Sequence, residues 1–438
     1  MMHFARIAAV ALLAATPLQA EIDIQPVETE AGFSAWLVEE RTIPFVAIEV
    51  IFPGGAVLDT EETLGATPLM TALLGEGAGD LDAQGFAAAV EATAGSIRFD
   101  AGRDSVSLRI RALTENRDEV LELARQALTQ PRFDETALER VRAQTIASLE
   151  RGARDPNTIA ARTFNEQAFD GHPYARPTDG TPETVDALSR DDILAAHQTT
   201  LTRDRVIVGA AGDISAEELA AVLDALLGDL PAASAELPDY AEFTAPGGIT
   251  VIDHPGPQSV IAFGHAGIRR DDPDFMAAFV MNEIFGGGRF GTRLMRELRE
   301  IRGLTYGVGS SVATAQHGDS FQGRLSTDNA RVGEVVELLR SEWEWLAEGG
   351  ITQADLERVQ TYLTGAYPLR FDGNASIAGI LASMQFQGFD IDYVNIRNDL
   401  VRAVTLEDIH RVAERIIDPE GLHFVIVGQP QGLDGLSF

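Results

Sequence analysis

Two stretches of the chain, PRFDETALERVRAQTIASL (131–149) and GGITQADLERVQTYLTGAY (349–367), share a hydrophobic pattern and the run LERV. A second pair of segments, 189–213 and 405–429, leads from a helical pattern into the apolar runs RVIVG and FVIVG. The same order of elements at the same separation indicates that one α/β unit of about 200 residues occurs twice in the chain.

Within each unit, short runs rich in β-branched and aromatic residues predict strands, such as 45–52 in the first unit and 259–263 in the second. Longer helical segments follow these runs instead of alternating strictly with them. We therefore expect an α/β (α+β) fold of two homologous units, 21–230 and 249–438, each a mostly antiparallel mixed sheet covered by helices. The segment 231–248 is rich in Pro, Ala, Gly and acidic residues without a period, which predicts a surface linker.

Composition excludes several classes of function. The chain has 34 basic and 67 acidic residues, a net charge of -33, which argues against nucleic acid and anionic membrane surfaces as partners. Every basic residue is arginine, so no lysine is present for a Schiff base or a GxxxxGK[ST] phosphate loop. The absence of cysteine rules out disulfides, thiolate nucleophiles and cysteine zinc sites.

The first twenty residues have the pattern of a signal peptide. Arg6 supplies the positive charge, Ile7–Ala15 a short apolar core, and Pro17–Ala20 a turn and a small residue for cleavage after Ala20. No later run approaches eighteen apolar residues, so no membrane span is expected once this signal is removed. An exported chain without cysteine is most simply periplasmic.

Common catalytic constellations are missing from the sequence. A catalytic zinc usually needs two histidines close together on one helix, but no two histidines after the signal peptide lie within ten residues of each other. No GxSxG motif marks a serine nucleophile. The glycine-rich run GGGRFG (286–291) follows a predicted helix and not a strand, so we interpret it as a tight turn and not a phosphate-binding loop.

The remaining signal is the pair Arg299 and Tyr306, seven residues apart across a helix end, Gly303 and a strand start. A guanidinium donates two directed hydrogen bonds, and a phenol can donate one to a carbonyl oxygen that gains negative charge. Taken as an isolated pair, an arginine on a solvated helix face is the plainer interpretation.

The pair lies within GGGRFGTRLMRELREIRGLTYGV (286–308), which resembles the signature of the C-terminal half of the pitrilysin/insulinase family of zinc peptidases. That family is built from duplicated α/β units of this size, and the resemblance covers about residues 25 to 430. It implies that Arg299 and Tyr306 correspond to the family's arginine and tyrosine, which contact the carbonyl of the scissile region of the substrate. The loop GHPYARPTDGT (171–181) is also similar to the family's loop after the metal-site helices.

The chain departs from this family at the zinc motif HxxEH, which the resemblance places after Gly65 in GATPLMTALLGE (65–76). The first histidine, the glutamate base and the second histidine are replaced by Pro68, Thr71 and Ala72. The distal glutamate is expected at 144–148, where QTIAS carries no carboxylate.

The resemblance therefore implies a non-catalytic, substrate-positioning subunit of a two-chain periplasmic peptidase. A partner chain bearing HxxEH would supply the zinc and the activated water, and this chain would hold no cofactor of its own. An alternative is a catalytically inactive peptide-binding or structural protein of the same fold. A third is an independent enzyme with an unrecognised site.

Overall fold

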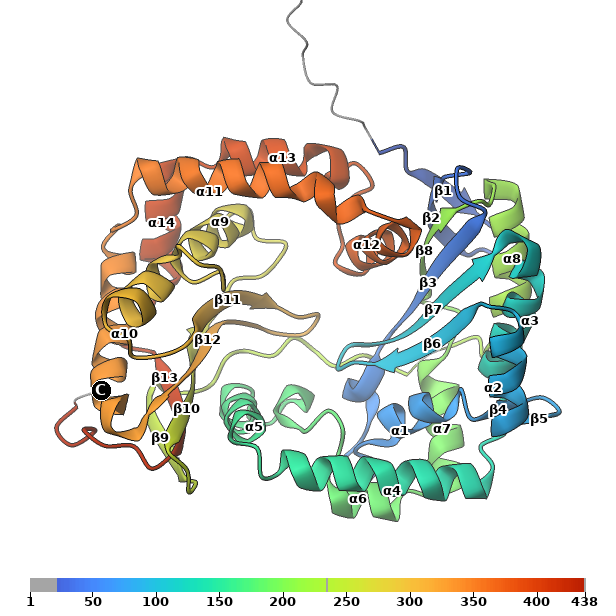
Figure 1. Cartoon of the computed structure of the whole chain (residues 1–438), viewed down its shortest axis with the longest axis horizontal. Coiled ribbons are helices and arrows are strands. Elements are labelled where there is room, and N and C mark those ends of the chain that lie inside the picture. The colour runs from blue at the N-terminus through green and yellow to red at the C-terminus, as the bar shows by residue number, and fades with distance from the viewer. Residues whose placement is uncertain (1–21, 234, 437–438) are drawn as a thin grey trace, which may run out of the picture.

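The computed structural model of the chain describes residues 22–233 and 235–436. Two β-sheets face each other across a central gap, and each sheet carries helices on its outer side (Figure 1). The predicted signal peptide, residues 1–20, lies outside the described residues. No helix in the described part of the chain is long and apolar enough to cross a membrane.

The first half forms a six-stranded sheet, in the order β1-β2-β8-β3-β7-β6, and a small hairpin, β4-β5. Its strands are β1 (Gln25–Glu28), β2 (Ser34–Glu39), β3 (Phe45–Pro53), β4 (Gly77–Ala78), β5 (Leu81–Asp82), β6 (Ser96–Ala101), β7 (Ser105–Leu113) and β8 (Ile207–Gly212). Its helices are α1 (Ala66–Leu73), α2 (Ala83–Ala92), α3 (Arg117–Thr129), α4 (Glu135–Gly152), α5 (Pro156–Ala168), α6 (Pro182–Ala187), α7 (Arg190–Thr200) and α8 (Ala216–Leu227).

The second half forms a five-stranded sheet in the order β11-β12-β10-β13-β9. Its strands are β9 (Gly248–Asp253), β10 (Gln258–Ala266), β11 (Val308–Thr314), β12 (Asp319–Asp328) and β13 (His423–Gly428). Its α-helices are α9 (Phe275–Phe285), α10 (Val332–Ala347), α11 (Gln353–Ala366), α12 (Asn374–Phe386), α13 (Tyr393–Ala403) and α14 (Leu406–Ile416), and a π-helix, η4, covers Met295–Ile301.

The two sheets confirm the predicted duplication. Apart from the extra edge strand β1, the order β2-β8-β3-β7-β6 of the first sheet matches β9-β13-β10-β12-β11 of the second. In both sheets one pair is parallel, β2 with β8 and β9 with β13, and the other pairs are antiparallel. Each half is therefore a mixed, mostly antiparallel sheet, as the sequence predicts.

One detail of the sequence repeat differs in the structure. The letters RVIVG (205–209) and FVIVG (424–428) match, but β8 begins at Ile207 and ends at Gly212, which is the structural counterpart of Gly428. The equivalent helices before these strands, α7 and α14, start with the matched capping boxes of Ser189 and Thr405. The two capping residues therefore mark equivalent positions in the repeat. The shared motif VIVG is shifted by three residues, because Gly212 and not Gly209 corresponds to Gly428.

Each half lends one helix to the sheet of the other half. Helix α12 of the second half packs on β8 and β3 of the first sheet, and α5 of the first half packs on β10 and β13 of the second. Figure 1 shows both helices on the inner sides of the sheets, next to the gap. This exchange joins the halves into one unit and places both helices beside the cavities described below.

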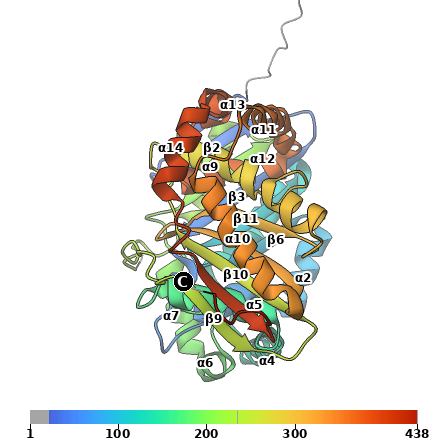
Figure 2. The ribbon, with the colours of Figure 1, turned by 90° about the vertical axis from the view of Figure 1, so that its left-hand side faces the viewer.

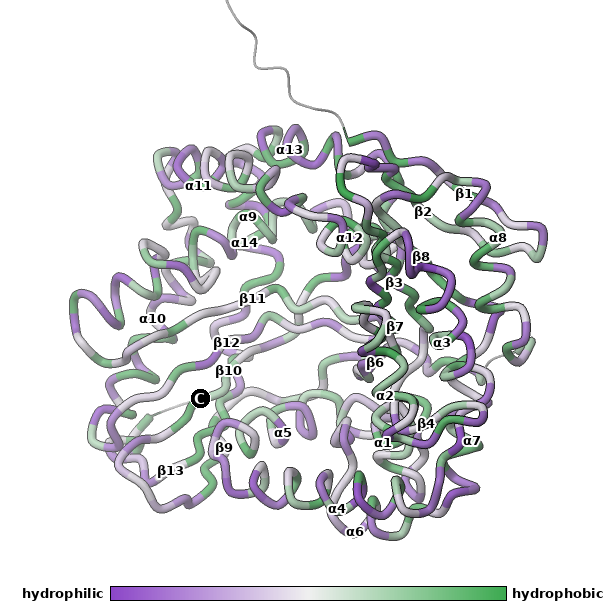
Figure 3. The backbone as a smooth tube through the Cα atoms, turned by 45° about the vertical axis from the view of Figure 1, so that its right-hand side comes forward, coloured by the Kyte–Doolittle hydropathy of each residue, from purple (hydrophilic) through white to green (hydrophobic). Residues whose placement is uncertain are grey.

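The outer side of each sheet is buried under helices of its own half. Figure 2 shows α10 and α14 over the outside of the second sheet. Their inward side chains, such as Val336, Trp343 and Ile409, belong to one apolar core with strand residues of that half. In Figure 3 the peripheral helices α10 and α13 alternate between purple and green along their turns, as expected for helices that bury one side.

Candidate functional site

The segment 286–308 begins with a turn that connects α9 to the π-helix η4, which agrees with the predicted role of the glycine run. At the other end of η4, Gly303 adopts a left-handed conformation (φ 59°), and its amide donates to the Arg299 carbonyl at 3.1 Å. A left-handed residue ends a helix and turns the chain away. The turn directs the chain through Tyr306 into β11, which starts at Val308.

Buried ion pairs hold η4 in place. The Glu297 side chain is 8% exposed and forms salt bridges with Arg302 at 2.6 Å and with Arg293 at 3.4 Å. Arg293 also donates Nε and Nη2 to the two oxygens of Glu342, at 2.6 and 3.1 Å. A bidentate pair of this kind fixes the geometry of both partners. The π-helix η4 is thus anchored through its neighbours, and Arg299 is left out of these pairs.

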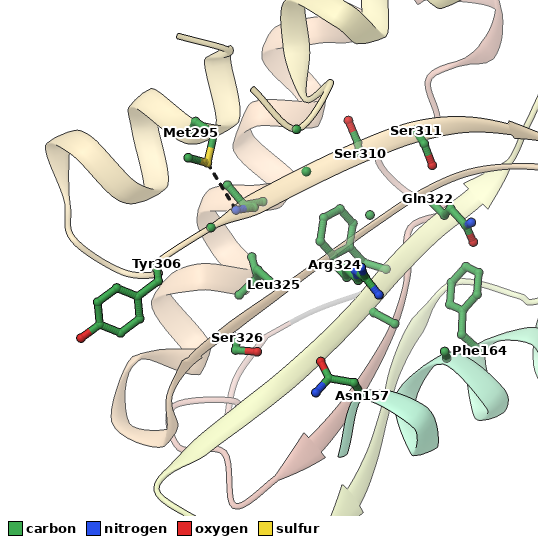
Figure 4. A pocket seen from close by; sticks show the side chains of 18 of the residues that line it. Asn157, Phe164, Met295, Tyr306, Ser310, Ser311, Gln322, Arg324, Leu325 and Ser326 are labelled. Atoms are coloured by element: carbon green, nitrogen blue, oxygen red, sulfur yellow. Dashed lines mark hydrogen bonds between the residues drawn. The ribbon is translucent and has the colours of Figure 1, made fainter. Parts of the chain in front are cut away.

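The structure brings Arg299 and Tyr306 together as two lining residues of one cavity of about 1050 Å³. The Arg299 guanidinium carbon lies 4.6 Å from the centre of the Phe290 ring, a cation–π contact. Tyr306 is 87% exposed. In Figure 4 its phenol extends from the loop before β11, away from the strand. Both groups are therefore available to a bound chain, and the plainer reading of Arg299 as an isolated surface arginine does not describe its surroundings.

Two further arginines line this cavity, and neither is singled out by the sequence. Arg324 lies on β12, and Arg103 lies in the turn between β6 and β7 of the first half. Figure 4 shows Arg324 among the lining residues, with Asn157 and Phe164 of α5 on the opposite wall. Among residues 22–233 and 235–436, no aspartate or glutamate lines the cavity. These residues are far apart in the sequence, and they come together only through the strand register and the packing of α5 on the second sheet.

The loop 171–181 contacts Arg103 through the ring of Tyr174. Tyr174 is fully buried, and its hydroxyl donates to Asp104 Oδ1 at 2.8 Å and accepts from the His317 amide at 2.8 Å. The Arg103 guanidinium lies 4.8 Å from the centre of the Tyr174 ring. Burial raises the pKa of Tyr174 well above its usual value. This phenol stays protonated and ties the first half to the turn before β12.

His172 does not take part in a metal site. Its Nδ1 accepts from the Tyr174 amide at 3.1 Å, and its Nε2 lies 3.0 Å from the Asp239 carbonyl oxygen. Partial burial lowers the pKa of His172, so the neutral ring is favoured. Through these two contacts the histidine stabilises the loop.

The residues of α1 do not fit a zinc ion. Pro68 and Ala72 offer no ligand atom, and the buried Thr71 hydroxyl donates to the Thr67 carbonyl at 2.8 Å within the helix. Helix α4 contacts α1 but carries QTIAS at 144–148, without a carboxylate. Within residues 22–233 and 235–436, no group of three or more His, Asp or Glu side chains could hold a metal ion.

Asp59 anchors the start of α1 through hydrogen bonds. Its carboxyl accepts from the Gly65 amide at 3.1 Å, the Thr67 amide at 3.1 Å and the Thr67 hydroxyl at 2.6 Å. Burial raises the pKa of Asp59 to about 6, although these hydrogen bonds oppose the shift. The helix that carries Pro68, Thr71 and Ala72 is thus held by capping interactions of ordinary kinds.

Comparisons with known proteins agree with this architecture. The model of the insulinase family (peptidase family M16) matches residues 36–182, and the model of the peptidase M16 inactive domain matches residues 187–363. The non-peptidase homolog YmxG of Helicobacter pylori is 27% identical over 394 residues, 89% of this chain and 90% of that protein. An uncharacterized zinc protease of Streptomyces coelicolor is 24% identical over 369 residues, 82% of this chain and 80% of that protein.

Solved structures show the same fold over nearly the whole chain. The crystal structure of a peptidase M16 inactive domain from Pseudomonas fluorescens has a TM-score of 0.88 and 26% identity, and the match covers 95% of this chain and 100% of that one. A protease from Helicobacter pylori has a TM-score of 0.84 at 17% identity, with 93% of this chain and 100% of that one covered. With two successive family models that match residues 36–182 and 187–363, and relatives along almost its full length, the chain belongs to the insulinase family, peptidase family M16.

Proposed function

We propose that this protein is the non-catalytic, substrate-positioning subunit of a periplasmic two-chain zinc peptidase. Its partner is an M16 chain that bears HxxEH and supplies the zinc. The observation that carries the proposal is the contrast between α1, where Pro68, Thr71 and Ala72 offer no metal site, and the cavity that Arg299 and Tyr306 share. The likeness to a non-peptidase homolog and to an inactive-domain structure supports a member without peptidase activity of its own.

The geometry suits a positioning role. A phenol on an exposed side chain can donate to a peptide oxygen that becomes negative, and a guanidinium can hold a neighbouring carbonyl. Tyr306 follows a left-handed glycine turn, and Arg299 projects from a helix fixed by the ion pairs of Glu297. The helix that carries Arg299 is already held by these ion pairs before a substrate arrives, so this donor loses little freedom when a substrate binds.

The test is cleavage by the two chains together. Coproduction of the protein with its HxxEH-bearing partner should give an active pair that cleaves a quenched fluorescent peptide, and neither chain alone should match it. Arg299→Ala and Tyr306→Phe should each lower kcat by about 10²-fold or more, because Tyr306 would donate to the oxygen that becomes negative and Arg299 would hold the neighbouring carbonyl in place.

Arg296→Ala is the matched control, because Arg296 lies on the same helix, is 63% exposed at its side chain and does not line the cavity. It should leave cleavage unchanged. Full activity of both the Arg299 and Tyr306 variants would refute the catalytic-support role. Tightly bound stoichiometric zinc in the isolated chain would contradict the account of α1.

A second candidate is a peptide-binding or structural protein without any role in hydrolysis. The size of the cavity within a single chain, about 1050 Å³, favours it. A purified protein that binds peptides as a monomer or homodimer, and that neither binds nor stimulates an HxxEH chain, would support this candidate over the first.

A further inference from the structure

The cavity of Arg299 and Tyr306 has a charge opposite to that of the chain. In the part of the chain that the structure describes, it is lined by Arg103, Arg299 and Arg324 and by no acidic residue, although the chain has 67 acidic residues against 34 basic ones. Among the described residues, none of these three arginines takes part in an ion pair with a carboxylate. A cluster of unpaired guanidinium groups at a concave surface attracts anions.

The first sheet has an arginine, Arg109, at the position equivalent to Arg324 of the second sheet. Arg109 of β7 lies opposite Glu49 of the central strand β3, and Arg324 of β12 lies opposite Ala262 of the central strand β10. The strand orders of the two sheets match, so the two arginines occupy equivalent places. They differ in the charges around them.

Two carboxylates neutralise Arg109. Its Nε lies 3.2 Å from Glu49 Oε1, and its Nη1 lies 2.9 Å from Asp100 Oδ2. In the second sheet the place of Glu49 is taken by Ala262 and that of Asp100 by Ser311, each identified from the residue it faces on the neighbouring strand. Both acidic partners are thus absent around Arg324, and the cation is left open toward the cavity.

The rest of the lining suits a peptide. The side chains of Asn157 and Asn165 on α5 and Gln322 on β12 carry both donors and acceptors, which match the groups of a polypeptide backbone. Phe164 and Phe290 add apolar surface. A volume of about 1050 Å³ is enough for several residues of an extended chain, and far more than a single small anion needs.

We propose that this cavity selects peptides with carboxylate side chains, and that Arg324, assisted by Arg103, binds that carboxylate. The identity of the ligand as a peptide rests on the function proposed above, whereas the preference for a carboxylate rests on the unpaired arginines. Arg324 is a specificity-determining residue, distinct from Arg299 and Tyr306 at the reacting carbonyl.

The test uses the isolated mature chain and isothermal titration calorimetry at low salt. The probe is the blocked peptide acetyl-Ala-Ala-Glu-Ala-Glu-Ala-Ala-amide, compared with the same peptide in which both Glu are Gln. The Gln peptide should bind at least about tenfold more weakly, because a hydrogen bond to a charged group contributes more than one between neutral groups. Arg324→Gln should weaken binding of the Glu peptide by a similar factor and leave the Gln peptide unaffected.

Arg109→Gln is the matched control, because Arg109 occupies the equivalent place in the first sheet but lines a different cavity. It should leave both affinities unchanged. Equal binding of the Glu and Gln peptides would overturn the proposal, and so would an equal loss in the two arginine variants. A third peptide, acetylated heptaalanine with a free C-terminal carboxylate, distinguishes binding of a C-terminal carboxylate from binding of a side-chain carboxylate. Binding of this peptide alone would overturn the assignment to side-chain carboxylates.

The outcome does not depend on catalysis. If the isolated chain prefers the Glu peptide but never supports cleavage by an HxxEH chain, the positioning role fails and the carboxylate site stands. If the pair of chains cleaves peptides but the isolated chain shows no preference for Glu over Gln, the carboxylate site fails and the positioning role stands.

Discussion

The two sheets share a strand order but present different inner faces to the gap between them. Three residues in register mark the difference: Glu49, Arg109 and Gly209 in the first sheet, and Ala262, Arg324 and Val425 in the second. The first set places its charges in ion pairs and allows a helix to lie directly on the strands. The second leaves its arginine unpaired beside the larger cavity.

The exchanged helices explain how one duplicated unit gives two different surfaces. Helix α12 crosses the first sheet where β8 is reduced to glycine and alanine, and the small buried residues Ala47, Ala211 and Ala378 form the contact. Helix α5 meets the second sheet through larger side chains, with Phe164 packed against Val425 in one apolar cluster. Small residues bring a helix close to a sheet, whereas large ones hold it away and leave room beside it.

The largest effect is expected where the small-residue contact is closest. Gly209→Val places in β8 the residue that β13 has at the equivalent position. A Cβ at Gly209 would lie 2.3 Å from the Ala378 carbonyl oxygen and 2.5 Å from the Ala382 amide nitrogen, which are backbone atoms that cannot move alone. We expect a loss of more than about 3 kcal/mol in the free energy of unfolding, measured by urea denaturation.

Gly152→Ala is the control for this prediction, because the added Cβ would meet its nearest neighbour, Thr158, at an ordinary 3.6 Å. It should change the stability by no more than about 0.5 kcal/mol. A loss below about 1 kcal/mol for Gly209→Val would show that α12 can move away from the sheet, and would remove the distinction between the two exchanged helices.

A smaller effect concerns Asp104 and Asp319, which occupy equivalent places before or at the start of β7 and β12. Each accepts from a tyrosine hydroxyl, Tyr174 for Asp104 and Tyr240 for Asp319. Burial raises the pKa of Asp319 from 3.8 to about 7. Between these pH values the folded state binds the proton more tightly than the unfolded state, so the stability falls as the pH rises from about 4 to about 7.

Urea unfolding at pH 4.5 and pH 8 measures this effect. Asp319→Asn should remove roughly 2 kcal/mol of the pH dependence. Asp390→Asn, at an exposed carboxylate, should keep the pH dependence of the parent chain. Parallel pH profiles for the parent and Asp319→Asn would contradict the raised pKa.

The features that the sequence predicts correctly are those with a local cause. Helices α2 and α8, for example, start at single capping residues, Asp82 and Ser215, whose side chains accept hydrogen bonds from amides of the first turn. The side chains of Pro68 and Ala72 offer no metal-ligand atom, and this is read directly from the residue types. Because such patterns repeat within each unit, the duplication and the mixed sheets could be predicted without a structure.

The basic cavity could not be predicted, because its parts meet only through register and exchange. The sequence does not show that Arg324 lies opposite Ala262 and not opposite an acidic residue. It also does not show that Arg103, in a turn of the other half, lines the same cavity. The crossing of α5 and α12 has no signature in either helix alone. The resemblance predicts a role for Arg299 and Tyr306, but no sequence pattern predicts the positive charge around them.

The smallest effect is the most direct test of the comparison between the sheets. Ala262→Glu gives Arg324 the partner that Glu49 provides for Arg109. In the first sheet, Arg109 Nε lies 3.2 Å from Glu49 Oε1. The new carboxylate should pair with Arg324 and compete with a bound one. We expect the affinity for the blocked Glu peptide to fall about tenfold, with the affinity for the Gln peptide unchanged, both by calorimetry.

The reciprocal change separates charge from packing. Glu49→Ala exposes Arg109 in the first sheet but should leave peptide binding in the second sheet unaltered, because Glu49 lines a different cavity. Ala262→Gln adds nearly the same volume as Ala262→Glu without the charge. If Ala262→Gln weakens the Glu peptide as much as Ala262→Glu does, the cavity excludes the ligand by size, and the missing carboxylates around Arg324 are not what attracts it.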